Sequence, residues 1–538
     1  MPVLTGIDVL GVQRFVFSSN RLKDVVAGSY LVEWSTSREG ALLELLHKGW
    51  IEKDEDILLA SGANAFIVFT DKVKARTFAA EYTRLLYDKA PGVEVIIVHE
   101  EISKEGLAAA LQKIQKNILP RKKTERIPSV PLAGVSVTAT CMETGFPAVD
   151  FAPDESNQPI SRNIAKRRQE EIRNKTNGYW KKCLLKGRDE FDFPLNLEEL
   201  GRTVGDTSLI GVVHVDGNGV GELIKNWLNK KAETGNNDDL FRKEYKKWSG
   251  AIDELCKASL EAVVECLCNS VNTKDGRLNG RPERLAFDLK KTDSGNAWML
   301  PFRPILLGGD DLTFVCDGRI ALDLAETALQ VFESEKSDIP HLDKPIRACA
   351  GVAIVRVRSP FIRAYHLAEQ LCQSAKMKVK ENGGDHCAID WHIGLGRPGQ
   401  ALSEIRNKQY HSAHYELTCR PYCLERQINN EQGHTSWQWL SHVLLDDDLC
   451  GLRGKVWAER RNKVMNLQEL VHDGPKIVES ALEAWQVIDN KLQFPAPVAK
   501  SGFIDNQRTP LLDAVELLDL HLKLGNKEKK QETKKEDG

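Results

Sequence analysis

Residues 306–314 read Leu-Leu-Gly-Gly-Asp-Asp-Leu-Thr-Phe, which places two adjacent carboxylates on a glycine hairpin between apolar runs. Gly308 and Gly309 tolerate the positive φ of a tight hairpin and let a phosphate approach the backbone closely. Asp310 and Asp311 point hard oxygen ligands at one place, which suits a divalent metal such as Mg²⁺ or Mn²⁺. By itself the stretch also fits an ordinary exposed turn, because Gly and Asp are common turn residues.

The segments around this hairpin have the order of a ferredoxin-like sheet. A strand at 211–215 is followed by a helix from Val220, a long helical segment to about 272, strands at 302–307 and 312–316, a helix at 318–336 and a strand at 346–357. A further helix (360–380) and strand (386–393) follow. In the β-α-β-β-α-β order the first and third strands are neighbours. We therefore expect Asp216, which ends the first strand, to lie close to the hairpin carboxylates and share one or two metal ions with them.

The N-terminal region repeats the same order of elements. Strands are expected at 3–9, 56–60, 65–69 and 93–100, with helices at about 21–47 and 72–88. Aligned on the later copy, Asp8 falls on Asp216, and the tip Ser-Gly-Ala-Asn (61–64) falls on 308–311. This first copy lacks both hairpin carboxylates. Its Asp8, Gly62 and Asn64 can still receive a phosphate or a ribose, but they can hardly hold two metals.

Composition indicates a globular protein of several domains. The chain has 538 residues, 41% hydrophobic and 28% charged, and a formal net charge of −3, which argues against a surface that binds nucleic acid throughout. Twelve scattered cysteines suggest reduced thiols in a cytoplasm. We see no signal peptide and no apolar run of about 18 residues, so no membrane partner is expected.

Four stretches together resemble a known family. They are IDVLGVQRFVFSSNRLKDVVAGSYLVE (7–33), HVDGNGVGELI (214–224), the GGDD hairpin, and AGVAIVRVRSPFIRAYHLAEQLCQSAK (350–376). The combination, which covers most of 1–100 and 205–393, is similar to the large polymerase-like subunit of type III CRISPR effector complexes. It is more distantly similar to the GGDEF nucleotide cyclases.

The resemblance implies an α+β fold with two ferredoxin-like palm domains, helical insertions and a C-terminal helical domain. The expected divisions are a degenerate first palm (1–118), a linking helical region with a degenerate zinc-ribbon-like segment (119–204), a catalytic second palm (205–393), a C-terminal helical domain (394–525) and a disordered charged tail (526–538).

The resemblance also implies a nucleotidyltransferase that joins ATP 3′ to 5′ into cyclic oligoadenylate for antiviral defence. Asp216, Asp310 and Asp311 would be the catalytic metal ligands. The nucleotide-binding residues would be Gly308, Gly309, Asn218, Gly221, Lys376, Asp8, Gly62 and Asn64. The implied partners are ATP, the other subunits of a guide-RNA-containing complex, and target RNA.

The departures from the family pattern leave alternatives open. Asn218 stands where the family often has a second Asp, and the single Cys141 in CMETGFPA (141–148) cannot build a tetrahedral zinc site, so no zinc is expected. No His-Asp pair precedes the first palm, so DNase activity is not expected. The chain is compatible with a non-catalytic, architectural nucleotide-binding subunit, or with a stand-alone signalling cyclase.

Overall fold

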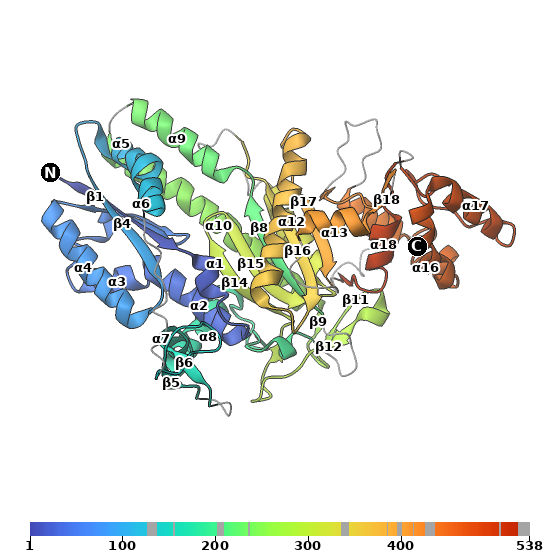
Figure 1. Ribbon diagram of the computed structural model, residues 1–538, viewed down its shortest axis with the longest axis horizontal. Helices are drawn as coiled ribbons and strands as arrows, with labels where there is room; N and C mark the ends of the chain where they lie inside the picture. Colours follow the sequence, from blue (N-terminus) through green and yellow to red (C-terminus); the bar gives the residue numbers. More distant parts are fainter. Residues whose placement is uncertain are drawn as a thin grey trace, which may run out of the picture.

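The computed structural model describes residues 1–125, 137–153, 157–201, 209–234, 237–334, 344–384, 386–394, 401–412, 414–424, 436–504 and 507–525. The fold is mixed α+β, as predicted, and is built around two large sheets. Figure 1 shows the first sheet and its helices at one end, the second sheet in the centre, and the last helices at the opposite end. Within the described residues, no helix combines the length and apolar character that crossing a membrane requires.

The first sheet has the strand order β2-β3-β1-β4, which is the predicted ferredoxin-like order. Its strands are β1 (Val3–Leu10), β2 (Ile57–Ser61), β3 (Asn64–Phe69) and β4 (Glu94–Glu101). Its helices are α1 (Val12–Val16), α2 (Leu22–Thr36), α3 (Ala41–His47) and α4 (Lys72–Lys89), followed by α5 (Gly106–Lys113), a π-helical turn (Ile114–Ile118) and α6 (Leu119–Glu125). Every residue of β1 from Val3 to Val9 is buried, which makes this strand the centre of the core.

The prediction of a single helix over about 21–47 is wrong, because the segment forms two helices, α2 and α3. The chain leaves α2 at Ser37 and folds back at Gly40, whose ψ of −124° is not helical. A Cβ at Gly40 would lie 2.2 Å from the Trp34 carbonyl oxygen, so the turn depends on a glycine here.

The second sheet has the order β14-β15-β8-β16-β17-β20. Its strands are β8 (Leu209–Gly217), β14 (Phe302–Gly308), β15 (Asp311–Asp317), β16 (Ala348–Arg356), β17 (Ala388–Gly394) and β20 (Tyr422–Cys423). The first four repeat the order of the first sheet, and β17 extends it in parallel to β16. Eight of the nine residues of β16 are buried, as is typical of a strand with both faces covered.

Long helices connect the strands of the second sheet. They are α9 (Val220–Thr234), α10 (Asp238–Ser270), α11 (Ala321–Glu333) and α12 (Phe361–Glu381). Of these, α11 and α12 pack against the sheet. Between α10 and β14 lie the short strands β9 (Val271–Asn272), β10 (Arg277–Leu278), β11 (Gly280–Arg281), β12 (Phe287–Asp288) and β13 (Trp298–Met299). Strand β13 pairs with β7 (Phe191–Asp192) of the preceding segment.

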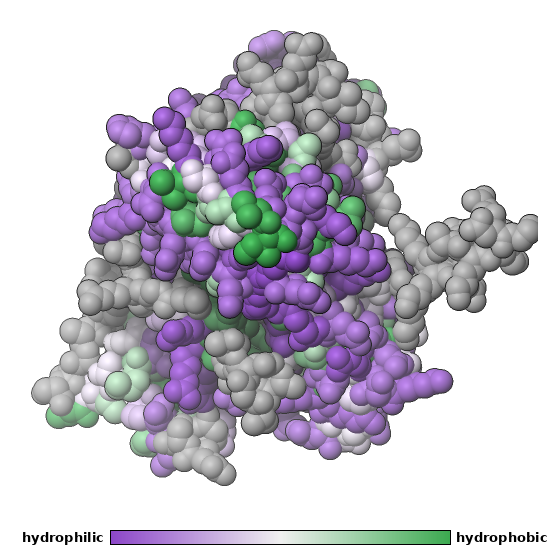
Figure 2. All heavy atoms as spheres, turned by 90° about the vertical axis from the view of Figure 1, so that its right-hand side faces the viewer, coloured by the Kyte–Doolittle hydropathy of each residue, from purple (hydrophilic) through white to green (hydrophobic). Residues whose placement is uncertain are grey.

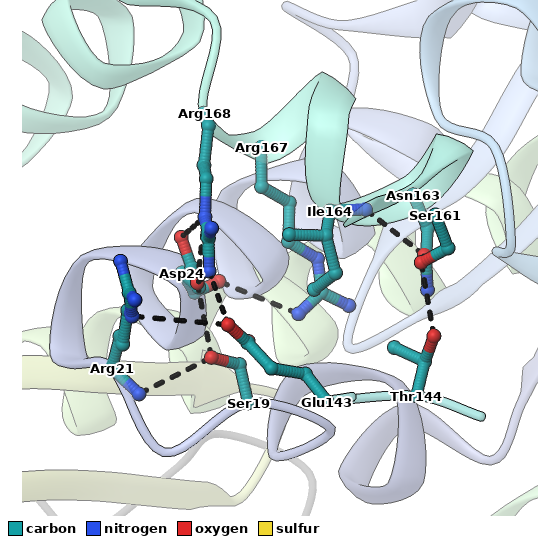
Figure 3. Close-up of polar contacts among 10 residues, drawn as sticks. All are labelled: Ser19, Arg21, Asp24, Glu143, Thr144, Ser161, Asn163, Ile164, Arg167 and Arg168. Atoms are coloured by element: carbon teal, nitrogen blue, oxygen red, sulfur yellow. Dashed lines mark hydrogen bonds and ion pairs between the residues drawn. The ribbon is translucent and has the colours of Figure 1, made fainter. Parts of the chain in front are cut away.

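The segment between the two sheets contains β5 (Ala148–Phe151), β6 (Pro159–Ser161), α7 (Arg162–Arg167) and α8 (Glu170–Leu184). Figure 3 shows the polar contacts that fix it to the first unit. The Arg168 guanidinium donates to the Asp24 carboxylate at 2.7 Å and also pairs with Glu143. Cys141 is buried with Ala152 and its apolar neighbours in a small separate cluster.

The chain after β17 is less helical than predicted. It forms α13 (Leu402–Gln409), β18 (His411–Ser412), β19 (Tyr415–Glu416), α14 (Trp437–Trp439) continued by a π-helical turn (Leu440–Leu445), α15 (Lys455–Ala458), α16 (Arg461–Leu470), α17 (Pro475–Gln486), α18 (Leu511–Leu517) and β21 (Lys523–Leu524). Strand β20 joins the second sheet, and β21 pairs with β11. This segment is therefore tied to the second unit by strand pairing as well as by helix packing.

The domain boundaries predicted from the sequence stay predictions, and the charged tail at 526–538 lies outside the described residues. Figure 2 shows the side of the molecule at the right of Figure 1, where hydrophilic residues surround a small group of hydrophobic ones. Val487 and Ile488, just after α17, are 87% and 83% exposed.

We predict that Asp24→Ala lowers the free energy of unfolding by about 3–5 kcal/mol, because it leaves the buried Arg168 guanidinium without its main partner. Urea unfolding followed by circular dichroism measures this. The control is Glu44→Ala, which breaks an exposed pair with Lys48 and should change the free energy by about 0.5 kcal/mol or less. Equal effects of the two substitutions would contradict a structural role for the buried pair.

Candidate functional site

The hairpin carboxylates lie beside Asp216, as the strand order predicted. Asp311 is directly opposite Asp216 in the pairing of β15 with β8. The Gly217 amide donates to the Asp310 carbonyl at 2.9 Å, which holds the end of β8 against the hairpin tip. The strand register thus brings Asp216, Asp310 and Asp311 to one edge of the second sheet.

The first sheet has the same construction without the hairpin carboxylates. Asp8 is directly opposite Asn64 in the pairing of β1 with β3, and the Val9 amide donates to the Ala63 carbonyl at 2.9 Å. The pairing of Asp8 with Asn64 corresponds to that of Asp216 with Asp311, and the hydrogen bond from the Val9 amide corresponds to that from the Gly217 amide. The alignment of the two copies made from the sequence is therefore confirmed at the level of backbone register.

The two hairpin tips touch each other at their glycines. A Cβ on Gly62 would lie 3.2 Å from the Gly309 amide nitrogen, and one on Gly308 would lie 3.2 Å from the Gly62 Cα. Gly62 and Gly309 have φ values of 58° and 60°, in the left-handed region that favours glycine. Glycine at both tips allows the two sheets to meet there, backbone against backbone.

One cavity of about 660 Å³ opens beside this contact. Eight of the residues predicted for the site line it: Asp8, Gly62, Asn64, Asp216, Gly308, Gly309, Asp310 and Asp311. Its other walls include Trp248 and Asp253 on α10 and Lys123 on α6. Residues from both units therefore form a single acidic cavity.

The crowding of these carboxylates changes their acidity. Burial and, to a smaller extent, the neighbouring Asp310 and Asp216 raise the pKa of Asp311 to about 8. Burial and Asp216 also raise the pKa of Asp310. Ionising all three groups together is costly without a positive charge close by.

Two lysines supply part of that positive charge. Lys376 on α12 lies 2.6 Å from the Asp216 carboxylate and donates to the Gly217 carbonyl at 2.8 Å. Lys123 on α6 lies 2.7 Å from the Asp8 carboxylate in the first unit. The sequence pointed to Lys376 through its family position, whereas Lys123 was only one of several basic residues in RKKTER (121–126).

The donor set fits a divalent cation. Carboxylate oxygens are the ligands that Mg²⁺ and Mn²⁺ prefer, and Asp216, Asp310 and Asp311 present them at the rim of one cavity. Burial and, after it, repulsion by the neighbouring carboxylates raise the pKa of both hairpin aspartates, so their ionised forms have too little opposite charge close by. A bound cation would offset that repulsion.

A larger cavity, of about 1170 Å³, lies on the other side of the hairpin contact. Gly62, Gly308 and Asp311 line both cavities. The walls of the larger one come from the β1–α1 turn, from α2, from β14 and from α12. Gln13 bridges the two units across it, donating to the Tyr365 hydroxyl at 2.9 Å.

Three predicted residues do not line these cavities: Asn218, Gly221 and Lys376, of which Lys376 contacts the smaller one only through Asp216. The Asn218 side-chain amide donates to the His386 carbonyl at 3.4 Å, and its backbone amide donates to the Arg347 carbonyl at 2.6 Å, so the residue is turned toward the loop before β17. Gly221 instead lines a small space of about 370 Å³ with Lys116 and Lys225. Their roles in nucleotide binding stay predictions.

Comparison with solved structures assigns the fold to a class, that of the large subunits of type III CRISPR complexes. The individual structures are of Csm1. The crystal structure of Csm1 in T. onnurineus has a TM-score of 0.53 and 14% sequence identity, over 97% of this chain and 69% of that one. An apo Csm1–Csm4 cassette has a TM-score of 0.51 and 14% sequence identity, over 96% of this chain and 70% of that one.

A Csm1–Csm4 cassette in complex with AMPPNP gives a TM-score of 0.50 and 14% identity, over 96% of this chain and 69% of that one. No family model matches the sequence, and no curated protein matches it either. The resemblance noted in the sequence is thus confirmed by the fold, at an identity too low for residue roles to follow from it.

We predict that Asp311→Asn stabilises the metal-free protein, and that the gain increases from about pH 5 to about pH 8. The folded pKa of Asp311, about 8, lies above its ordinary value of 3.8. The unfolded state therefore releases this proton at lower pH, and stability falls as pH rises between the two values. Asparagine does not titrate and removes this loss. Urea unfolding in EDTA measures it.

The matched control is Asp293→Asn, which changes an exposed carboxylate outside both cavities. Its effect on the free energy of unfolding should be small and independent of pH. A gain for Asp311→Asn that is the same at every pH would contradict the raised pKa.

Proposed function

We propose that this chain is a nucleotidyltransferase that joins ATP into cyclic oligoadenylate within a CRISPR-type antiviral defence system. The observation that carries the proposal is the direct pairing of Asp216 with Asp311, with Asp310 on the same hairpin and all three lining one cavity. This arrangement suits two-metal nucleotidyl transfer better than simple nucleotide storage.

Asp216, Asp310 and Asp311 would hold Mg²⁺ or Mn²⁺, which supplies positive charge that lowers the pKa of a ribose 3′-hydroxyl and offsets charge on departing pyrophosphate. The chain's own residues position the nucleotides. Lys376 and Lys123 place positive charge at the edges of the acidic cavity, where a triphosphate would lie. The bare glycine tips let phosphates approach the backbone.

The two units would have different tasks. The second unit has all three carboxylates and would activate the attacking hydroxyl. The first has Asp8 and Asn64 at the equivalent positions and would hold the other nucleotide. Both hairpins border both cavities, so two nucleotides bound on either side would meet at the carboxylates.

The structural neighbours support this substrate class. Csm1–Csm4 cassettes of the same fold are described in complex with AMPPNP, pppApApA and cA3, each with a TM-score of 0.50. By analogy, the partners of this chain would be a Csm4-like subunit, the other subunits of a guide-RNA complex, and target RNA. The function comes to this chain as a proposal, because 13–14% identity establishes the fold alone.

A second candidate function is architectural. The observation that favours it is the ion pair of Lys376 with Asp216, which neutralises one of the three metal-binding carboxylates. A subunit of this kind would bind a nucleotide in the cavity without turning it over. Phage defence would then survive the double substitution Asp310→Ala with Asp311→Ala.

We predict that the purified chain with ATP and Mg²⁺, alone or in its complex with target RNA, forms cyclic oligonucleotide detectable by mass spectrometry. Asp310→Ala and Asp311→Ala should each lower the rate by about 100-fold or more, because each removes a metal ligand that stabilises the transition state. EDTA should abolish the reaction.

Asp293→Ala is the control and should leave the rate unchanged, since Asp293 lines neither cavity. If no nucleotide is consumed under any activation while the wild type binds Mg²⁺ through Asp310 and Asp311, the enzyme proposal fails and the architectural one stands. Product formation without target RNA would favour a stand-alone cyclase.

A further inference from the structure

Helices α2 and α10 carry the same side-chain pattern where they line the two cavities. Ser29, Val32 and Glu33 line the larger cavity, and Ser249, Ile252 and Asp253 line the smaller one. In each helix a serine is followed by an aliphatic residue at i+3 and an acid at i+4. These spacings place the three side chains on one helix face.

Each helix belongs to one unit and packs on the other. The Ser29 hydroxyl of α2 donates to the Ile305 carbonyl in β14 of the second unit. Asp253 of α10 accepts a hydrogen bond of 2.7 Å from the Ser61 hydroxyl in β2 of the first unit. The arrangement is reciprocal, so each cavity has an acidic residue from one unit beside the hairpin strand of the other.

The two acids nevertheless differ in their hydrogen-bond partners. Ser61 aligns with Gly308 in the second hairpin, and glycine has no hydroxyl to offer Glu33. Within the described part of the chain, Glu33 forms no hydrogen bond or ion pair through its carboxyl group. Glu33 is only partly buried and lines the larger cavity, so its carboxyl group is open to a hydrogen-bonding ligand there.

The surroundings of Glu33 suit a purine nucleotide. Val32, Leu306 and Leu307 provide apolar wall, and Gly308 and Asp311 border the same cavity at the hairpin. A nucleotide with its phosphates toward the metal-binding carboxylates would extend its base along these apolar residues. The polar edge of such a base would remain free to form hydrogen bonds with a side chain of the cavity.

We propose that Glu33 is the residue that selects adenine in the larger cavity, through two hydrogen bonds between its carboxyl group and the base edge. The inference rests on the proposed function, since it assumes a nucleotide substrate. A protonated carboxyl group has one donor and one acceptor side by side, which match a ring nitrogen and the N6 amino group of adenine. An ionised carboxylate has only acceptors and would match guanine instead.

The acidity of Glu33 agrees with the protonated form. Burial and, to a smaller extent, the charge of Asp253 raise the pKa of Glu33 to about 7. The other titratable groups recorded around it are Asp253 on α10, whose pKa burial raises to about 6, and Tyr179 on α8, which stays neutral because burial raises its pKa too. A second negative charge in the cavity that Asp311 also lines would repel the triphosphate.

The test measures binding of AMPPNP and of GMPPNP to the full chain with Mg²⁺ by isothermal titration calorimetry. Glu33→Leu removes both hydrogen-bonding atoms and should reduce the preference for adenine over guanine by about 10- to 100-fold, the usual value of a two-point base contact. Glu33→Gln keeps one donor and one acceptor, so its preference should stay within about twofold of the wild type.

The pH dependence of binding distinguishes recognition of the base by Glu33 from a purely structural role of this residue. Wild-type affinity for AMPPNP should fall as pH rises above about 7, whereas Glu33→Gln should lack this component, because its amide does not ionise. The matched control is Glu81→Gln, an acid-to-amide change on α4 outside both cavities. Thermal unfolding checks that each variant is folded.

Two results would overturn the inference alone: an unchanged adenine preference in Glu33→Leu, or a loss in Glu33→Gln as large as in Glu33→Leu. Either would leave nucleotide binding and turnover in place. Failure of the wild type to bind either analogue would overturn the proposed function as well, so the two failures are distinguishable.

Discussion

The contact between two glycine hairpins is the constraint on which the rest of this structure depends. Gly62 and Gly308 come together so closely that a single Cβ on either would lie 3.2 Å from backbone atoms of the other tip. Because of this approach, Asp8 and Asn64 of one sheet share a cavity with the three carboxylates of the other. Neither sheet could form that cavity alone, so the site is a property of the interface.

Bringing acids together in this way opposes folding, and the stabilising interactions lie elsewhere. The pKa of Asp311 reaches about 8 because burial and its neighbours disfavour the charged form. Folding is favoured by the burial of nearly every residue of β16 and by the buried ion pair of Arg168 with Asp24. This pair holds the segment between the sheets against α2. This division of roles is common where strained or charged groups serve a site.

Much of the fold could be predicted because strand alternation, apolar runs and hairpin spacing are local signals. The proximity of Asp216 to Asp311 followed from register alone. The direction of Asn218 could not be predicted, since it depends on His386, 168 positions away. The role of Lys123 likewise depends on a distant residue, since it pairs with Asp8. The break at Gly40 has a local cause, the close approach of the Trp34 carbonyl to this glycine. The shared pattern of Glu33 and Asp253 was present in the sequence, but only the reciprocal packing of α2 and α10 gives it meaning.

Asp311 borders both cavities, and this has a thermodynamic consequence. Charge brought by a ligand on one side changes the potential at this carboxylate, and so changes the work of bringing a second ligand to the other side. Linkage requires the effect to be the same in either order of binding. For the two nucleotides proposed above, the hairpin would therefore be a shared wall through which the two binding equilibria are coupled.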